Sequence, residues 1–138
     1  QKTCVLQHFG KAAIRLHIPR FQCSLPYLET HSSLLYYMTT LGVSVHTVEE
    51  AIKAEQLGAT YLMASHVFPT ACKPSDPPIG VDTVEAICKA VKIPVYALGG
   101  VTPKTISQLQ DVPIKGVALM SGLMTCPDVP EYLKELRA

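Results

Sequence analysis

From residue 41 onward, short apolar runs alternate with segments of helical spacing, and this alternation limits the possible folds more than any other feature of the sequence. The apolar runs cover residues 41–46, 60–66, 94–100 and 116–123. Strands that are apolar on both faces and joined by helices are typical of a parallel sheet with helices outside it. We therefore expect an α/β fold.

Helix-start signals follow these runs and support the same interpretation. A capping box pairs a Ser, Thr or Asp with a Glu three residues later, and proline favours the first turn of a helix. The signals are Thr47 with Glu50, Asp82 with Glu85, and Thr102 with Pro103. Residues 128–137 are predicted to add a short amphipathic helix at the end of the chain.

The first 40 residues follow the pattern less clearly. Residues 2–7 ("KTCVLQ") and 13–18 ("AIRLHI") are predicted to form two further short strands. Residues 32–40 ("SSLLYYMTT") are predicted to form a helix, although their β-branched and aromatic content lowers its propensity. Because no linker or low-complexity segment divides the chain, we expect residues 1–138 to form one domain.

The composition fits a globular domain that binds no large polyanion. The chain has 138 residues, of which 48% are hydrophobic and 17% are charged, and its formal net charge is +1. The basic residues are scattered, which argues against a nucleic-acid or acidic-membrane surface but leaves room for a small anionic ligand. No apolar run approaches the roughly 18 residues that span a membrane.

The five cysteines and the first residue bear on where the protein works and on its length. The cysteines are odd in number, widely spaced and without a C-x-x-C pair. This usage is typical of reduced thiols in the cytoplasm rather than of disulfides or a zinc site. The chain begins at Gln1 rather than at a methionine, so we expect a piece or a processed form of a longer chain.

Residues suited to ligand binding fall at the ends of the four predicted strands, where parallel α/β sheets bind their ligands. They are Ser44, His46, His66, Gly99, Gly100, Ser121 and Gly122. The glycines would let a ligand approach the backbone, and free N–H groups favour an anion. We therefore predict a phosphate site in the loops after the last two strands; the alternative is that these glycines only turn the chain.

His66 and the proline-rich segment after it, residues 69–78, complete the predicted site. An imidazole titrates near neutral pH and suits proton transfer, although a lone histidine is more often structural. Thr70 could donate its hydroxyl to a ligand or stabilise the turn, and Lys73 could pair with an anion or stay solvated. Cys72 has no adjacent base and is better explained as a small loop residue.

Four motifs resemble the thiamine phosphate synthase and thiazole tautomerase family. "GVSVHTVEEA", "HVFPTACK", "PVYALGGVTPK" and "GVALMSGL" stand in the order and spacing seen in that family. The resemblance implies a (β/α)8 TIM barrel, of which this chain would supply only the third to eighth strands, because a full barrel needs at least ~200 residues. We expect a missing N-terminal segment or a homo-oligomer to cover the open sheet edges.

Within this family, the synthase branch joins a pyrimidine diphosphate to a thiazole phosphate with magnesium. The resemblance places its Asn-Asp pair after the third strand and a His-x-Gly-Gln-x-Asp segment after the fourth. Here His8 and Phe9 stand in place of the acid pair, and no aspartate follows His17. The diphosphate and magnesium site is therefore expected to be lost, and no cofactor is expected.

The tautomerase branch carries its proton-transferring histidine in a segment similar to "HVFPTACK". The resemblance thus implies an isomerase in which His66 aromatises a thiazole carboxylate phosphate, with the phosphate on the two glycine-containing loops and with Thr70 and Lys73 near the ligand. Thiamine phosphate synthase is the alternative. A non-catalytic member that binds a phosphorylated ligand or regulates thiamine metabolism is the third hypothesis.

Overall fold

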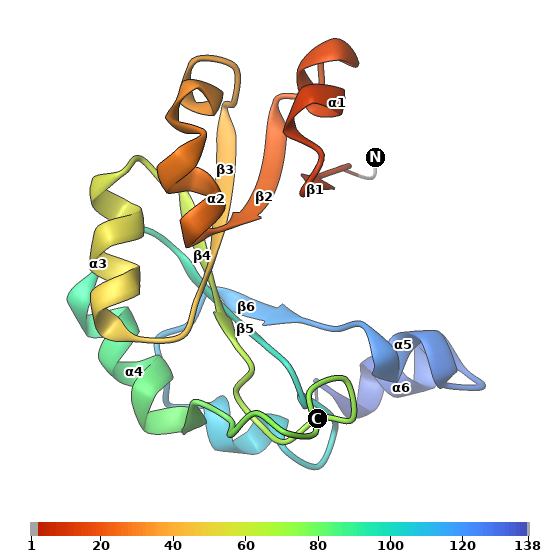
Figure 1. Cartoon of the computed structure of the whole chain (residues 1–138). Helices are drawn as coiled ribbons and strands as arrows, with labels where there is room; N and C mark the ends of the chain where they lie inside the picture. Colours follow the sequence, from red (N-terminus) through yellow and green to blue (C-terminus); the bar gives the residue numbers. More distant parts are fainter. Residues whose placement is uncertain (1–2, 138) are drawn as a thin grey trace.

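The computed structural model describes residues 3–137, which form one open parallel sheet (Figure 1). Its strands are β1 (Leu6–Gln7), β2 (Arg20–Ser24), β3 (Thr40–Val45), β4 (Tyr61–Ser65), β5 (Val95–Leu98) and β6 (Gly116–Ala118). They are hydrogen-bonded in chain order, each parallel to its neighbours. Within residues 3–137, β1 and β6 each pair on one side only. The predicted α/β class is confirmed.

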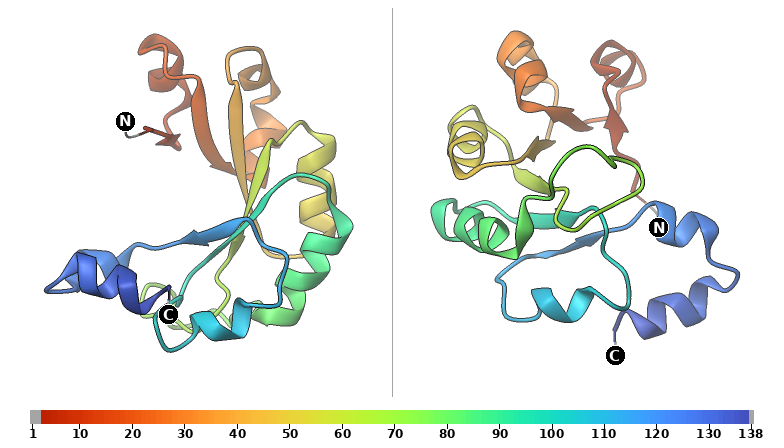
Figure 2. Two further views of the ribbon diagram at one scale, coloured as in Figure 1. Left: turned by 180° about the vertical axis from the view of Figure 1, so that it is seen from behind. Right: turned by 60° about the horizontal axis from the view of Figure 1, so that its bottom comes forward.

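Helices connect the strands and lie on one side of the sheet. They are α1 (Gly10–Arg15), α2 (Leu25–Thr30), α3 (Val48–Gln56), α4 (Gly80–Ala90), α5 (Ser121–Thr125), α6 (Val129–Glu135) and the 3-10 helices η1 (Ser32–Tyr36) and η2 (Ile106–Leu109). Figure 2 shows α1 to α4 along the outside of the curved sheet, with α5 and α6 beyond β6. Among residues 3–137, none of these helices combines the length and the apolar character that crossing a membrane requires.

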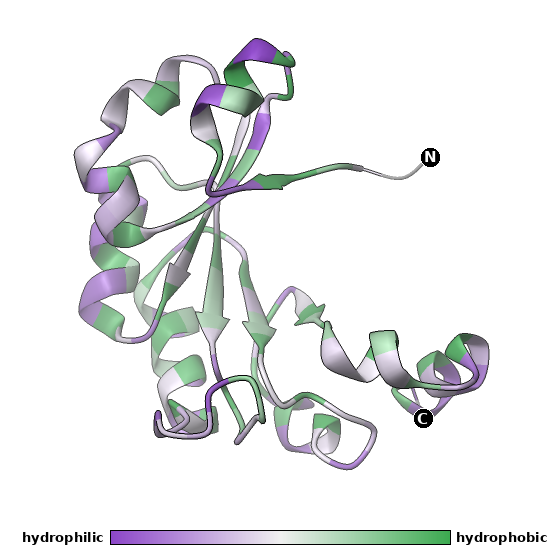
Figure 3. Cartoon of the chain, turned by 45° about the vertical axis from the view of Figure 1, so that its right-hand side comes forward, coloured by the Kyte–Doolittle hydropathy of each residue, from purple (hydrophilic) through white to green (hydrophobic). Residues whose placement is uncertain are grey.

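The sheet face that contacts the helices, which we call the outer face, is apolar and buried. Its side chains are Phe21, Cys23, Leu41, Val43, Val45, Leu62, Ala64, Val95 and Ala97, all at most 3% exposed. They pack with Ala51 and Ala54 of α3 and with Val84 and Ile87 of α4, pairs whose spacing places them on one side of each helix. Figure 3 shows hydrophobic segments, coloured green, recurring along the strands and helices. The core therefore lies between sheet and helices.

The opposite, inner face is polar and aromatic, because successive strand residues point to opposite sides. The register aligns Gln22, Gly42 and Tyr61 in one row and Ser44, Met63 and Tyr96 in the next. The rings of Tyr61 and Tyr96 meet edge to face with centroids 5.7 Å apart. Much of this face is partly exposed. The expectation of strands apolar on both faces is therefore wrong for the inner face.

Two helices begin where the sequence predicts. The Thr47 hydroxyl accepts a hydrogen bond from the Glu50 backbone N–H at 3.2 Å and opens α3. The Asp128 carboxylate likewise accepts from the Glu131 N–H at 3.0 Å and opens α6. These caps satisfy N–H groups that the first helical turn leaves without an intrahelical partner.

The N-terminal part differs from the prediction. Residues 13–18, expected as a strand, lie in α1 and the turn after it, and the strand is β2 instead. The run has good helix formers, and it packs the fully buried Ala13 against the sheet, whereas the extended segment begins only after Pro19. In the expected strand of residues 2–7, only β1 is a strand, and Lys2 lies outside the described residues.

The helix expected over residues 32–40 is also misplaced. Only the 3-10 helix η1 forms there, and the α-helix α2 precedes it. The Ser24 hydroxyl caps α2 by accepting from the Tyr27 N–H at 3.4 Å, and Pro26 lies in its first turn. A cap and an N-terminal proline outweigh the apolar run that follows, whose aromatic and β-branched residues disfavour an α-helix.

Three C-terminal elements are shorter or differently bounded than expected. Helix α4 begins at Gly80 without a side-chain cap, so Asp82 lies in its first turn, where a negative charge favours the helix dipole. The strand expected over residues 116–123 ends at Ala118, and Ser121 begins α5. After Pro103 only the 3-10 helix η2 forms.

Candidate functional site

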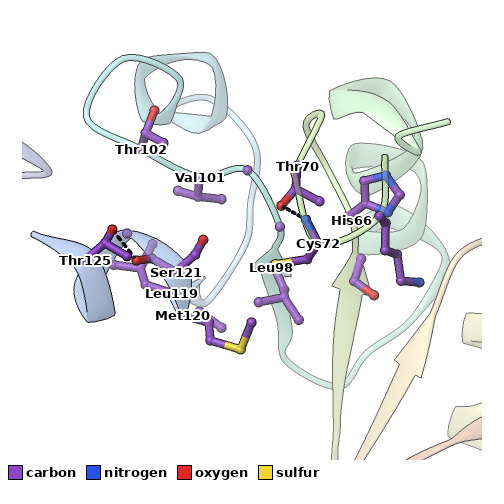
Figure 4. Close-up of a pocket in the computed structure, with 16 residues that line it drawn as sticks. His66, Thr70, Cys72, Leu98, Val101, Thr102, Leu119, Met120, Ser121 and Thr125 are labelled. Atoms are coloured by element: carbon purple, nitrogen blue, oxygen red, sulfur yellow. Dashed lines mark hydrogen bonds between the residues drawn. The ribbon is translucent and has the colours of Figure 1, made fainter. Parts of the chain in front are cut away.

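A cavity of about 310 Å³ opens beyond the carboxyl ends of β4, β5 and β6 (Figure 4). Most of the predicted site residues line it: His66, Thr70, Lys73, Gly99, Gly100, Ser121 and Gly122. The remaining lining is largely apolar and includes Leu98, Val101, Ala118, Leu119 and Met120. The volume is at the lower end of the range for small-molecule sites, so the cavity has room for one small ligand.

His66 forms the buried wall of this cavity and is only 5% exposed. Its ring Nε2 lies 3.2 Å from the backbone carbonyl oxygen of Asp76. Its own carbonyl oxygen accepts a hydrogen bond from the Ile79 N–H at 2.9 Å. We call the segment of residues 69–78 the 69–78 loop. The side chain of His66 is therefore bonded to the far end of this loop, and its main chain to the residue directly after it.

Gly99 and Gly100 fit closely against the end of β4, and the structure gives a steric reason for both glycines. Gly99 has φ +96°, and a Cβ there would lie 2.3 Å from the Cβ of His66. Gly100 has φ +67°, and a Cβ there would lie 2.6 Å from the carbonyl oxygen of Pro69. Only glycine avoids both the contact and the left-handed strain. Packing thus explains the pair whether or not it binds an anion.

Gly100 and Val101 line the cavity with two backbone donors that have no partner among the described residues. Within residues 3–137, the N–H groups of Gly100 and Val101 donate no hydrogen bond, whereas the Thr102 N–H donates to the Thr105 hydroxyl at 2.9 Å. Across the cavity, Ser121 and Gly122 form the start of α5. Gly122 is close-packed too, since a Cβ there would lie 2.3 Å from the Tyr132 hydroxyl.

The 69–78 loop brings Thr70, Cys72 and Lys73 to the cavity. The Thr70 hydroxyl accepts from the Cys72 N–H at 3.4 Å, which stabilises the turn, as Figure 4 shows. Among the described residues that line the cavity, Lys73 is the one cation. Its ammonium lies 3.9 Å from the Asp76 carboxylate, and because both groups are largely exposed, this pair adds little stability. Lys73 is therefore free to pair with an incoming anion.

Ser44 and His46 lie away from the cavity. Ser44 is on the inner face, and its hydroxyl oxygen accepts a hydrogen bond from Gln22 Nε2 at 3.0 Å. His46 precedes α3, where its ring Nδ1 is 3.1 Å from the Glu50 carboxylate and its backbone N–H donates to the same oxygen. The structure gives both residues local structural roles and does not gather them with His66.

Gln22 is an inner-face residue that sequence reasoning missed. Its side chain is 7% exposed, and within the described residues its Oε1 atom is buried without a hydrogen-bond partner. A polar amide inside an apolar strand is the signal that could have found it. The corrected position of β2 also changes the comparison with the His-x-Gly-Gln-x-Asp segment, since Ser24, not His17, ends this strand and Gln22 lies in its middle.

Three further lining residues were also missed as site residues. Thr102 was interpreted only as a helix cap, and its hydroxyl lies 3.2 Å from that of Thr105. Thr125 donates to the Ser121 carbonyl oxygen at 2.8 Å from the other wall, and Met120 is 61% exposed at the rim. The two threonines add hydroxyls on both sides of the predicted phosphate position, and only proximity to the glycine motifs could have indicated them.

The described residues do not fit a bound magnesium ion. Residues 3–137 contain no group of three or more His, Cys, Asp or Glu side chains arranged to hold a metal. The acid beside the cavity, Asp76, faces Lys73 instead. Magnesium in proteins is held by carboxylates together with substrate phosphates. The described residues are therefore assigned no metal-dependent reaction step.

Comparisons with known proteins point to one family. The family model described as Thiamine monophosphate synthase matches residues 14–123. The chain is 43% identical over 100 residues to "Thiamine-phosphate synthase 2" of Streptococcus pneumoniae, and 39% identical over 97 residues to "Thiamine-phosphate synthase" of Pyrococcus abyssi. Each match covers 70% of this chain, and 48% and 47% of the relatives respectively.

A solved structure shows the same similarity. "Thiamine phosphate pyrophosphorylase from Pyrococcus furiosus" superimposes with a TM-score of 0.79 at 30% sequence identity. The superposition covers 95% of this chain and 63% of that chain. The chain thus spans about half the length of the curated relatives it matches.

Proposed function

Because the chain belongs to the thiamine monophosphate synthase family, we propose that it supplies the thiazole-phosphate-binding part of a thiamine phosphate synthase. The observation that carries the proposal is the cavity at the ends of β4 to β6, lined by His66 and both glycine loops. The two relatives at 43% and 39% identity are named as thiamine-phosphate synthases. They favour the synthase hypothesis, which the sequence motifs ranked second, over the tautomerase.

The phosphate of the ligand would bind between the two glycine-containing loops. Unused N–H groups at Gly100 and Val101 and the hydroxyl of Ser121 are donors suited to phosphate oxygens. Lys73 would neutralise part of the charge from the 69–78 loop, with the Thr70 hydroxyl beside it. The apolar residues between these donors suit a small heteroaromatic ring.

The second substrate, a pyrimidine diphosphate, needs room outside this cavity. About 310 Å³ accommodates one small ligand, and the charged groups that a diphosphate and magnesium require are not gathered there. We propose that this substrate binds along the inner face, where Ser44 and the unsatisfied Gln22 amide lie. The joining reaction would then occur between the inner face and the cavity.

Closure of the sheet is part of the same proposal. The sheet would be the third to eighth strands of a (β/α)8 barrel, with two further βα units joining β1 to β6 from a preceding segment or another copy of the chain. Unpaired parallel edges and the longer solved relative support this. Light scattering tests closure by another copy, and a stable monomer of residues 1–138 with both edges bare would exclude that route. The unpaired cysteines support a cytoplasmic location.

A thiazole tautomerase is the second candidate, and the buried His66 imidazole favours it. A titratable ring on the wall of a small apolar cavity suits a proton shift on one bound heterocycle. This reaction would need neither the second substrate nor magnesium. A non-catalytic member that only binds the phosphorylated ligand is the third candidate, and it would show binding without either product.

The proposed function is tested first by binding. Calorimetric titration with thiazole phosphate should show affinity at least about tenfold above that for inorganic phosphate. Lys73→Met should weaken it by about tenfold or more, the usual effect of losing a charged hydrogen-bond donor. Lys89→Met, which removes a surface lysine paired with Glu85, is the matched control. Equal losses in both variants, or no preference for the thiazole, would contradict the proposal.

The product distinguishes the candidates. Thiamine phosphate formed from both phosphorylated precursors with magnesium supports the synthase. Aromatisation of the thiazole tautomer, lost in His66→Asn, supports the tautomerase instead. Binding without either product leaves the non-catalytic role.

A further inference from the structure

The 69–78 loop is bonded to the His66 ring through a backbone carbonyl rather than through a side chain. The distance from His66 Nε2 to the Asp76 carbonyl oxygen is 3.2 Å. A carbonyl oxygen only accepts hydrogen bonds, so the ring nitrogen facing it must carry the hydrogen. In the neutral ring, the other nitrogen, Nδ1, is then the acceptor.

We propose that the Asp76 carbonyl is a positioning group that fixes His66 as the Nε2–H tautomer and so makes Nδ1 the proton-accepting atom of the site. The inference concerns a different property from the proposed function, since it specifies which atom of His66 is basic whatever ligand the cavity binds. One hydrogen bond of ordinary strength favours one tautomer about two- to tenfold.

The loop is built to hold this carbonyl in place. Pro77 follows Asp76 directly and restricts the Asp76 backbone to extended conformations, which limits where its carbonyl can point. Beyond the two prolines, the Ile79 and Gly80 N–H groups donate to the carbonyls of His66 and Val67 at 2.9 and 3.2 Å. The loop end is therefore fixed to the strand end on both sides of the ring.

The opposite side of His66 is fixed by β5. The Cβ of His66 occupies the space that a side chain at position 99 would need, so the histidine lies directly on Gly99. The Cα and Cβ of His66 are thus held against the β5 end, while its ring nitrogen contacts the loop carbonyl, and the residue is 5% exposed. With its main chain held in this way, the Asp76 contact selects the ring nitrogen that faces the loop.

The test is the tautomeric state of His66 in the ¹⁵N-labelled full chain, read from the two ring nitrogen shifts on the neutral limb of a pH titration. His66→Gln identifies the signal by its loss. We expect the ratio of Nε2–H to Nδ1–H to exceed that of free neutral histidine in the same buffer by about two- to tenfold. A dominant Nδ1–H form, or a ratio no higher than that of free histidine, would overturn the proposal.

Loop variants then test the cause. Pro77→Gly frees the Asp76 backbone and should move the populations toward those of free neutral histidine, whereas Pro74→Gly, in the same loop but away from this carbonyl, should leave them unchanged. Asp76→Ala keeps the carbonyl and removes only the carboxylate, so it should also preserve the Nε2–H form. An unchanged tautomer in Pro77→Gly, or a loss in Asp76→Ala alone, would show that another group selects it.

Discussion

On β3, Val43 and Val45 are fully buried against the helices, whereas Ser44 between them points to the inner face and accepts a hydrogen bond from Gln22. The same alternation separates the two faces along β2 and β4. The outer face excludes polar groups because any buried there would lack partners. The inner face holds hydroxyls, an amide and glycine, and it leads to the cavity. Adjacent residues of one strand therefore divide between the buried core and the partly exposed inner face.

The sharpest test of this division is a pair of truncations on β4. Leu62→Ala empties space in the outer core and should lower the free energy of unfolding by about 2–5 kcal/mol. Met63→Ala, its neighbour on the partly exposed inner face, should cost less than half as much. Chemical denaturation of both variants measures the difference, and equal losses would mean that the inner face is also part of the core.

Two glycines outside the strands, Gly99 and Gly80, allow the cost of a steric conflict to be compared with the cost of backbone strain alone. Gly99→Ala should cost about 2 kcal/mol or more and displace His66, since its Cβ would meet the His66 Cβ at 2.3 Å in a positive-φ conformation. Gly80 also has a positive φ, +79°, but no atom lies within 4 Å of a Cβ added there. Gly80→Ala should therefore lower the free energy of unfolding by only about 1 kcal/mol. Thermal unfolding compares them. Similar costs would show that the β5 end shifts to accept a side chain.

Thiols and phenols on the two faces predict how stability depends on pH. Burial raises the pKa of Cys23, on the outer face, from 9.0 to about 11. The unfolded chain therefore loses this proton at a lower pH than the folded chain does, and the free energy of unfolding should fall between about pH 9 and 11. Burial, and secondarily Tyr96 and Cys23, also raises the pKa of Tyr61 on the inner face. Cys23→Ala should remove the first part of the decline, and Tyr61→Phe the later part. Denaturation across this pH range measures both, and an unchanged slope in Cys23→Ala would contradict the assignment.

The smallest effect is expected at Gln22. Its Oε1 atom has no partner within residues 3–137, while its Nε2 donates to Ser44. Gln22→Leu removes an unsatisfied carbonyl together with one hydrogen bond, so stability should change by no more than about 1 kcal/mol. Urea unfolding measures it, with Ser44→Ala as the control for the lost bond. A larger loss would show that the amide has a partner in solution.

The sequence predicted the elements after residue 41 well, because helix caps such as Thr47 and Asp128 and uncharged apolar runs are local signals. It failed before residue 41, where α1 is only six residues long and its helix depends on Ala13 packing against the sheet. Such a tertiary contact leaves no local pattern.

The candidate site shows the same limit. The motifs identified His66 and the glycines, and the structure places them around one cavity. Thr102 lies in the loop after β5 and Thr125 at the end of α5, so their proximity could not be read from their neighbours in sequence. Ser44 and His46 were predicted from strand ends alone, and the register and the Glu50 contact place them elsewhere.

The contact between Gly99 and His66 also affects how a protein with this scaffold can change over time. A Cβ at position 99 conflicts with the Cβ of any residue other than glycine at position 66. Position 66 can therefore exchange one side chain for another while Gly99 stays the same, whereas position 99 has no such freedom. A substitution at position 66 can thus change the chemistry of the cavity wall while Gly99 and the glycine loops stay as they are.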